Sequence, residues 1–424
     1  MRGRVVVGLV GVLVAALLVV AQGVGAPAAG QVTGSPVAAG NWVGTWTSMP
    51  QLTEPGNMPP PPFTQDGLVM ADTTLRQTVR VTAGGANLRL RFSNAFGGTA
   101  LPITAASVAL PAGGRAGVAA IEPGSVRPVT FNGRAATSVP VGAQVVSDPL
   151  AFPVAPRTNL TVTVYLQSGQ ASNAITSHPG SRTTSHLLAG NHVGAVDLPG
   201  ATPSDHWYFL SGVEVLAARG TAAVVMLGDS LTDGRGSTTN GNDRWPDQFA
   251  DRARHLAVLN QAAGGNRVLN DGLGPNALAR LDRDVLAQSG AEWLVVFEGV
   301  NDIGTAAATP EAQQQVAADL IAAYEQIVVR AHAQGIDVFG ATITPFGGNT
   351  AYDDPAGHRE AARQTVNRWI RTSRVFDTVI DFDKVARDPA TPRQLLTAYD
   401  TGDHLHFNPA GYRALANEVP TRLF

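Results

Sequence analysis

The sequence predicts two successive architectures: an all-β sandwich resembling a jelly roll over residues 41–218, and an α/β unit with a parallel sheet over residues 222–424. Residues 41–218 alternate apolar and polar side chains with period two and contain no long amphipathic helical pattern. After Thr221, short continuous apolar runs alternate with helical patterns, which is typical of a doubly wound sheet with helices on both faces. The length of 424 residues also favours two domains over one.

The N-terminus has the pattern of a secretory signal peptide. Arg2 and Arg4 precede an apolar run over residues 5–21, and small residues follow through residue 28. We expect a signal peptide over residues 1–28 and a flexible linker over 29–40. The mature protein is then predicted to be secreted to the extracellular space, with no membrane insertion after cleavage.

The first half contains clear strand patterns. Residues 88–92 and 160–166 alternate, and we expect each of these strands to bury one face. Asn132-Gly133 suits a hairpin turn because both residues tolerate positive φ. The last strand of this half is expected over residues 208–215, followed by a short joint at 217–220.

The second half alternates strands and helices. The apolar runs that predict buried parallel strands are residues 224–227, 293–297 and 338–343. A helix is expected over residues 310–333, since Thr309 can cap it and Pro310 suits its first position. Further helices are expected over residues 360–372 and from Asn408-Pro409 towards Leu423.

Composition excludes several classes of function. The net charge is −3 with no cationic run beyond the N-terminus, so the sequence predicts no nucleic-acid partner. There is no cysteine, which rules out disulfides, thiolate nucleophiles and cysteine-ligated metal sites. No histidine or carboxylate spacing typical of metal ligands occurs, and we expect neither a metal nor another cofactor.

A serine follows the first predicted parallel strand. The segment Gly228-Asp229-Ser230-Leu231 places Ser230 on a glycine-containing turn, where its Oγ and N–H can face a substrate. Taken alone, this serine is better explained as the cap of the next helix. Asp229 is expected to hold the turn by accepting backbone hydrogen bonds, as is Asp302 after a later strand.

A hydroxyl nucleophile needs a base, and one of the nine histidines has a suitable partner. In Asp403-His404-Leu405-His406, the carboxylate of Asp403 can reach Nδ1 of His406 and direct Nε2 towards the serine. His404 is the alternative base within this tetrapeptide. The other histidines lack a partner at a comparable spacing and are expected at the surface or as satisfied core residues.

Two further strand ends offer donors for a tetrahedral oxyanion. The segment 258–266 contains the glycine pair Gly264-Gly265, and Asn301 follows the strand at 293–297. Taken singly, the glycine pair indicates a tight turn and Asn301 a helix cap. Trp245-Pro246 either lines an acyl pocket or packs a helix start on the sheet.

Together these four ordered blocks resemble the SGNH (GDSL) hydrolase superfamily over residues 222–424. The resemblance implies a flavodoxin-like three-layer α/β/α domain without a cofactor. It also implies that Ser230 is nucleophile and oxyanion donor, that Gly265 and Asn301 are the other donors, and that His406 is the base with Asp403 as its partner. Gly264 remains an alternative to Gly265; the spacing of five from Asn260 favours Gly265.

The β-rich leader looks like that of two-domain members similar to arylesterases and acylhydrolases found beside xylan-degrading genes. Gly44-Thr45-Trp46 and the segment 93–97 carry this weaker likeness. We therefore predict a secreted serine ester hydrolase acting on a small-molecule or polysaccharide ester. Acetylated polysaccharides, aryl or alkyl esters and lipids remain open as substrates, the last implying a lipase or phospholipase. The alternative is a non-catalytic carbohydrate- or surface-binding protein.

Overall fold

The computed structural model describes residues 40–424, which fall within one compact unit. The predicted signal peptide at 1–28, and all of the predicted linker except residue 40, lie outside the described residues. Within residues 40–424, no helix combines the length and apolar character needed to cross a membrane.

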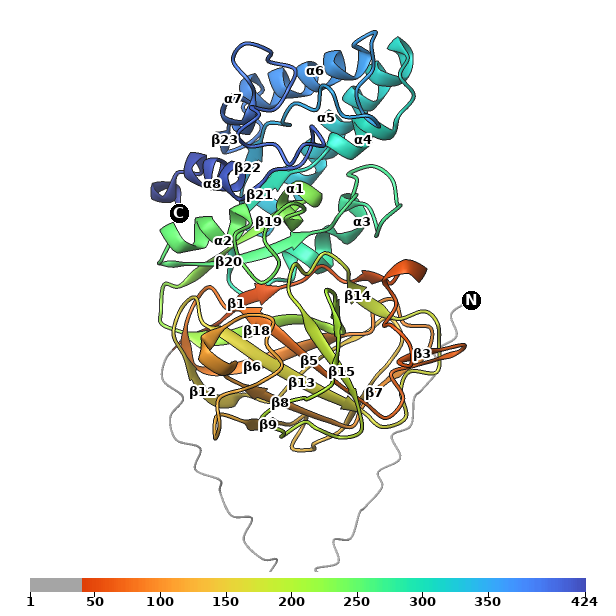
Figure 1. Ribbon diagram of the computed structural model, residues 1–424. Coiled ribbons are helices and arrows are strands. Elements are labelled where there is room, and N and C mark those ends of the chain that lie inside the picture. The colour runs from red at the N-terminus through yellow and green to blue at the C-terminus, as the bar shows by residue number, and fades with distance from the viewer. Residues whose placement is uncertain (1–39) are drawn as a thin grey trace, which may run out of the picture. The chain divides into compact units, whose positions relative to one another are not determined.

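Residues 41–217, called here the β-rich part, form antiparallel sheets and no α-helix (Figure 1). Its strands are β1 (Asn41–Thr47), β2 (Gln51–Leu52), β3 (Thr64–Gln65), β4 (Leu68–Val69), β5 (Thr73–Arg80), β6 (Gly85–Ser93), β7 (Leu101–Ile103), β8 (Ala105–Ala109), β9 (Arg127–Val129), β10 (Thr137–Val139), β11 (Gln144–Val146), β12 (Leu150–Val154), β13 (Asn159–Leu166), β14 (Thr176–His178), β15 (Ser185–Ala189), β16 (Thr202–Ser204), β17 (Trp207–Tyr208) and β18 (Leu210–Ala217).

Two larger sheets dominate this part. One has the order β16-β15-β5-β13-β8-β9, and the other has the order β1-β18-β6-β11 with β12 also paired to β6. In β6 the predicted alternation is found, because Leu88, Leu90 and Phe92 are buried while Arg89 and Arg91 reach the carboxylate of Glu214. The prediction of antiparallel β-structure is confirmed, and the more specific jelly-roll sandwich stays a prediction.

Two details of the predicted strands were wrong. Strand β13 is buried on both faces, since Thr161 and Thr163 are as inaccessible as the apolar residues between them. Thr163 accepts a hydrogen bond from the buried guanidinium of Arg76, which also donates to loop carbonyls and so fills the second face. The strand predicted at 208–215 is divided at Phe209, whose φ of 63° separates β17 from β18. Asn132 and Gly133, with φ of 52° and 75°, form the predicted turn.

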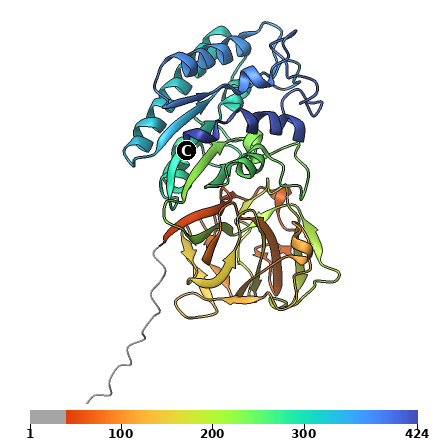
Figure 2. The same cartoon turned by 90° about the vertical axis from the view of Figure 1, so that its left-hand side faces the viewer.

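Residues 222–424, called here the α/β part, contain one parallel sheet with helices packed on it (Figure 2). The strands are β19 (Ala222–Gly228), β20 (Leu256–Ala262), β21 (Ala291–Phe297), β22 (Asp337–Ala341) and β23 (Thr378–Ile380). Their spatial order is β20-β19-β21-β22-β23, which is the 2-1-3-4-5 order of flavodoxin-like folds. The chain reverses direction across the sheet between β19 and β21, so their carboxyl ends border a crevice suited to a ligand.

The helices are α1 (Ser230–Asp233), α2 (Trp245–Arg252), α3 (Ala277–Leu281), α4 (Val300–Thr305), α5 (Pro310–His332), α6 (His358–Thr372), α7 (Phe382–Ala386) and α8 (Pro409–Glu418). Helix α8 packs with α2 and α7, while α5 packs with α3, α4 and α6. Thr309 caps α5 through a hydrogen bond from Ala312 N, as predicted. Helix α8 ends at Glu418 instead of near Leu423, because Pro420 excludes Val419 from the helical region.

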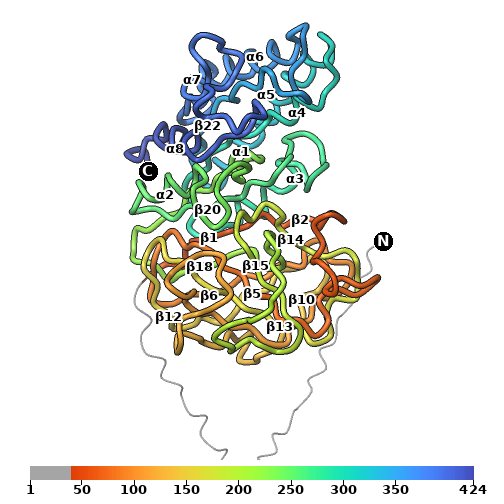
Figure 3. Tube along the Cα trace, viewed as in Figure 1, coloured from red at the N-terminus to blue at the C-terminus, as the bar shows by residue number. Residues whose placement is uncertain are grey.

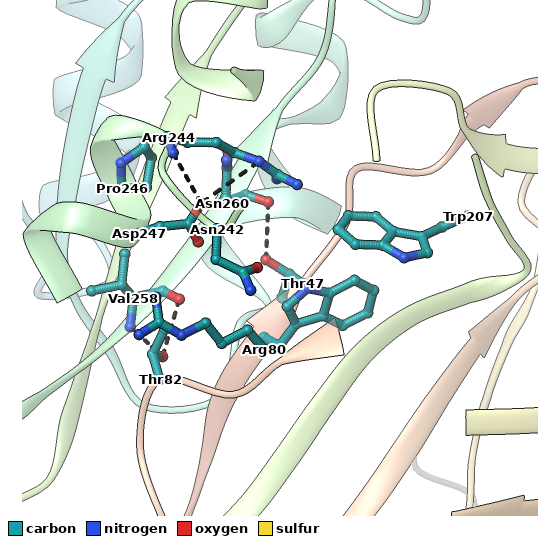
Figure 4. Close-up of a pocket in the computed structure, with 11 residues that line it drawn as sticks. Thr47, Arg80, Thr82, Trp207, Asn242, Arg244, Pro246, Asp247, Val258 and Asn260 are labelled. Carbon is teal, nitrogen blue, oxygen red and sulfur yellow. Dashed lines mark hydrogen bonds and ion pairs between the residues drawn. The ribbon is translucent and has the colours of Figure 1, made fainter. Parts of the chain in front are cut away.

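The β-rich part covers the exposed edge of the parallel sheet at β20. Strand β1 runs along this border (Figure 3). The Thr82 hydroxyl accepts a hydrogen bond from Val258 N at 2.9 Å and lies 3.2 Å from Val258 O, and Thr47 Oγ1 donates to Asn260 O (Figure 4). Threonine hydroxyls thus satisfy backbone groups that a further strand would otherwise pair. This contact joins the two parts beside the carboxyl end of β20.

Candidate active site

The predicted nucleophile lies at the carboxyl end of β19. Ser230 is the first residue of α1, and the Asp229 side chain caps that helix by accepting from Leu231 N at 2.9 Å. A Cβ on Gly228 would lie 2.5 Å from Thr232 Oγ1 and 2.8 Å from Phe297 O, so the tight strand-to-helix turn requires glycine there. Gly228 therefore allows the tight turn that places Ser230 at the carboxyl end of β19.

The segment 403–406 places an imidazole against this serine. His406 Nε2 lies 2.9 Å from Ser230 Oγ, and its Nδ1 lies 2.6 Å from Asp403 Oδ2. The other Asp403 oxygen accepts from the backbone N–H groups of Leu405 and His406 at 3.0 and 2.8 Å. Serine, histidine and aspartate thus form one hydrogen-bonded chain of three side chains, as the sequence predicted for these positions.

The electrostatics fit a neutral base and an ionised partner. Burial would raise the pKa of Asp403, but the hydrogen bonds from the backbone and ring of His406 lower that pKa to about 2. Burial lowers the pKa of His406, and the hydrogen bond to Asp403 opposes this shift only in part. Since an ionised Asp403 only accepts, Nδ1 carries the ring proton and the Nε2 lone pair faces Ser230.

The alternative base, His404, lies elsewhere. Its ring pairs with Asp400 at 2.7 Å and is half exposed to solvent. The His404 backbone has a φ of 62°, so the chain turns between the two histidines and directs their rings to different partners. Of the two histidines, only His406 reaches the serine.

The predicted oxyanion donors gather around the same hydroxyl. Ser230, Gly264, Gly265, Asn301 and His406 all line one cavity of about 470 Å³. The Gly264 N–H is engaged, because it donates to Asp233 Oδ2 at 3.1 Å. Within the described residues the Gly265 N–H has no hydrogen-bond partner. Gly265 therefore offers the freer donor of the glycine pair.

Asn301 is oriented by two neighbours. Its Oδ1 accepts from the Tyr352 hydroxyl at 2.7 Å, and its Nδ2 donates to Asn266 O at 2.8 Å. An amide nitrogen has two hydrogens, so one N–H remains for the cavity. Tyr352 lies in a loop between β22 and α6, and no sequence pattern indicates its part in the site.

Buried carboxyl groups lie behind the serine turn. Asp302 holds the glycine-containing loop through hydrogen bonds from Val268 N and Leu269 N, both at 2.9 Å. Burial raises the pKa of Asp302 to about 6 and that of Glu298 to about 7. Burial also raises the pKa of Asp229 well above its usual range. Asp229 and Asp302 thus hold turns, as expected from the sequence.

Trp245 does not line the cavity. The indole is fully buried, donates to Thr232 Oγ1 at 3.1 Å and packs edge-on against Phe382. Of the two roles considered for Trp245-Pro246, the packing role is the one found.

The β-rich part contributes one wall of the cavity, which the sequence did not indicate. This wall contains Gln51, Glu54, Asn57, Arg182 and His206. Glu54 accepts hydrogen bonds from Gln51 and Asn57 at 2.5 and 2.9 Å, so the wall is a connected polar surface. These residues lie on short strands and loops without periodicity, which explains why pattern analysis missed them.

A family model described as GDSL-like lipase/acylhydrolase matches residues 226–414. These residues form a GDSL-like lipase/acylhydrolase domain. The match supports the resemblance of these residues to the SGNH (GDSL) hydrolases and supports a carboxylic ester hydrolase over the non-catalytic binding protein considered from the sequence. The GDSL-like domain contains all five predicted site residues but none of the β-rich wall. No curated protein matches the chain.

Several solved structures are similar to part of the chain. One is a lipolytic protein of the G-D-S-L family from Desulfitobacterium hafniense DCB-2, with 19% sequence identity and a TM-score of 0.36. The match covers 48% of this chain and 99% of that chain. A GDSL-like lipase from Bacteroides thetaiotaomicron VPI-5482 has 16% identity, coverage of 46% and 84%, and a TM-score of 0.35. A carbohydrate acetylesterase from Sinorhizobium meliloti has 18% identity, coverage of 48% and 100%, and a TM-score of 0.36. Likenesses this distant do not bear on the substrate of this chain.

Proposed function

We propose that the protein is a secreted serine esterase that hydrolyses carboxylic esters through an acyl-enzyme on Ser230. The observation that carries the proposal is the continuous chain of hydrogen bonds from Ser230 Oγ through the His406 ring to Asp403. Secretion rests on the signal-peptide pattern of residues 1–28. We also propose residues 41–218 and 222–424 as its two domains.

In the first half-reaction, His406 Nε2 takes the hydroxyl proton as Ser230 Oγ attacks the ester carbonyl carbon. The carbonyl oxygen becomes an oxyanion, which the N–H groups of Ser230 and Gly265 and the Asn301 amide stabilise. When the tetrahedral intermediate collapses, the proton on Nε2 passes to the departing alkoxide. An alcohol leaves and the acyl group remains on Ser230.

In the second half-reaction, water replaces the alcohol in the site. His406 accepts a proton from that water as the oxygen attacks the acyl carbon, and the same donors stabilise the second oxyanion. Collapse breaks the bond to Ser230 Oγ, which regains its proton from His406. The products are a carboxylic acid and the free enzyme. Throughout, Asp403 holds the ring orientation and stabilises the imidazolium.

The lining of the cavity favours substrates that are esters of short acyl chains with hydrophilic alcohols. Of its 17 lining residues, 11 have polar side chains, among them Glu54 and Arg182, and the apolar side chains are those of Pro179, Leu273 and Leu405. A long acyl chain would leave those polar groups without water or partners, which disfavours binding. The proposal therefore favours small aryl or alkyl esters and acetylated saccharides over lipids.

The proposed nucleophile is tested by Ser230→Ala. The variant removes one oxygen next to the helix start, and we expect an unchanged Tm with loss of p-nitrophenyl acetate hydrolysis to the background rate. Ser373→Ala, at the C-cap of α6, is the matched control and should retain full activity. Turnover by Ser230→Ala above about one part in a thousand of wild type would contradict the proposal.

The substrate range is tested with p-nitrophenyl esters of two to twelve carbons, acetylated xylan and phospholipid vesicles. We expect kcat/KM to be highest for the shortest acyl chains and to fall steadily with length. A maximum at eight carbons or more would contradict the argument from the polar lining, without affecting the assignment of Ser230.

A further inference from the structure

A buried histidine of the β-rich part makes contact beside the serine turn. His178, the last residue of β14, is 3% exposed, and its Nε2 lies 2.9 Å from Asp233 Oδ1. Asp233 ends α1, three residues after Ser230, and is 1% exposed. Strands β14 and β2 lie at the border of the β-rich part near α1 and α3 (Figure 3). This is the side that faces the active site.

Both ring nitrogens of His178 lie within hydrogen-bond distance of an acceptor. Its Nδ1 lies 3.0 Å from the Met49 carbonyl oxygen, which can only accept. Its Nε2 faces a carboxylate oxygen of Asp233. Burial alone would raise the pKa of Asp233, but the charge and hydrogen bond of His178 outweigh burial and lower it, with further contributions from Arg182 and Arg244. The His178 ring therefore bridges the Met49 carbonyl and the Asp233 carboxylate.

The second oxygen of Asp233 reaches the oxyanion loop. Oδ2 accepts from the Gly264 N–H at 3.1 Å, one residue before the proposed donor Gly265. Two consecutive glycines have wide conformational freedom, and Gly265 adopts a φ of 71°. A donor on such a loop needs an external contact to hold its direction. Asp233 supplies that contact, and His178 fixes the position of Asp233.

The surroundings of His178 leave it little freedom to move. Its ring stacks on Trp207 at 5.8 Å, and Trp207 packs edge-on against Trp46 at 4.8 Å. Arg244 donates to the Ser181 carbonyl and lies over the Trp207 ring. A Cβ on Gly180 would fall 1.8 Å from Asp233 Oδ2, so the backbone after His178 also touches this carboxylate. The β-rich part thus makes a rigid, charged contact with the serine turn.

We propose that His178 is a positioning residue of the esterase, which holds the Gly265 N–H towards the oxyanion through Asp233 and Gly264. The inference rests on the proposed function, because it assumes that Gly265 donates to the oxyanion. It gives the β-rich part a direct role in the chemistry of a site that the GDSL-like domain does not complete by itself.

Two substitutions at one position separate positioning from mere structural support. In His178→Gln the amide nitrogen can occupy the place of Nε2 and keep the donation to Asp233, while the contact with Met49 is lost. In His178→Asn the amide nitrogen can replace Nδ1 and keep the contact with Met49, while Asp233 loses its partner. The two variants therefore remove opposite hydrogen bonds of the same ring.

Misplacing an oxyanion donor by about 1 Å lowers kcat roughly 10- to 100-fold. We expect that loss in His178→Asn with KM within about threefold of wild type, and recovery of most of it in His178→Gln. Because His178→Asn leaves a buried carboxylate unpaired and can fail to fold, Asp233→Ala is the second test. It releases the Gly264 N–H from its acceptor and should show the same loss of kcat.

The control is His332→Asn, which breaks another histidine–aspartate pair of similar length, with Asp377, at the end of α5. This control should retain wild-type kcat. A folded His178→Asn or Asp233→Ala variant with kcat within threefold of wild type would overturn the proposal. So would an equal loss in the Asn and Gln variants, or a rise in KM alone. Failure of the proposed function would show itself differently, as activity in Ser230→Ala. Failure of the positioning role would leave Ser230→Ala inactive and the His178 and Asp233 variants at wild-type kcat.

Discussion

Replacing Asp403 by asparagine should invert the proton arrangement of the His406 ring. In the wild type, Asp403 Oδ1 accepts two backbone N–H groups and Oδ2 accepts the ring Nδ1–H. An asparagine must keep its oxygen towards the two backbone donors, because an NH2 group there would face two hydrogens. Its NH2 group then faces Nδ1 of His406 and donates to it.

That exchange makes Nε2 the protonated nitrogen, so the ring can no longer take a proton from Ser230. Loss of the correct tautomer in a serine–histidine–aspartate site costs about 10⁴ in kcat. At 1.36 kcal/mol for each tenfold change, this corresponds to about 5 kcal/mol of transition-state stabilisation. The geometry of the site should otherwise be unchanged, since the oxygen still accepts both backbone groups.

The assay is steady-state hydrolysis of p-nitrophenyl acetate by wild type and Asp403→Asn, with Tm measured on both. Asp377→Asn alters a carboxylate that pairs with His332 away from the cavity and serves as the control, with kcat/KM expected within about twofold of wild type. The tautomer argument, and with it the role of His406 as base, would be refuted if Asp403→Asn retained a tenth or more of wild-type kcat/KM.

Three further results are expected. Because burial lowers the pKa of His406, kcat/KM should fall only as pH drops below the ordinary histidine value of about 6.5; an acid limb above pH 7 would contradict this. Tyr352→Phe frees the Asn301 amide and should lower kcat about tenfold with little change in KM; an unchanged kcat would contradict it. Glu298→Gln should raise the free energy of unfolding at pH 8 but not at pH 4, measured by urea unfolding; equal effects at both would contradict it.

The sign for Glu298 follows from proton linkage. Its pKa of about 7 in the folded protein exceeds the ordinary glutamate value of 4.5, so the folded state binds more protons between these pH values. Stability from this group is therefore present below pH 4.5 and is lost as pH rises through 7. The shift corresponds to about 3 kcal/mol at alkaline pH. A glutamine does not ionise and avoids that loss, while Arg280 keeps its contacts with Asp284 and Asn266.

The parallel sheet was predictable because buried strands carry continuous apolar runs. Residues 224–227 and 293–297 lie in β19 and β21, at the centre of the sheet, where both faces are covered by helices. The bounds predicted for α5 agree with the structure within one residue, because Thr309 and Pro310 mark the start of the helix. The end of α8 at Glu418 was also predictable, because Pro420 disfavours a helical conformation at Val419.

The side chains of the triad were predictable for a different reason. Each follows a strand or lies within a short local motif, so that the fold brings them to one edge of the sheet whatever their separation in sequence. Asp403 and His406 are three residues apart and need only one loop to meet. The relation between Ser230 and His406 spans 176 residues and was supplied by the resemblance of the ordered blocks.

The contact between His178 and Asp233 could not be predicted from local sequence patterns. Its strand has three residues and its partner Asp233 lies 55 residues later, so neither periodicity nor local spacing connects them. What fixes the pair is the docking of the β-rich part on the edge of β20, where Thr82 replaces a missing strand partner. A local motif indicates which groups can react. The direction of the N–H groups proposed to stabilise the oxyanion depends instead on a contact between distant segments. The β-rich part is therefore the place where changes in sequence should alter rate without altering any residue of the triad.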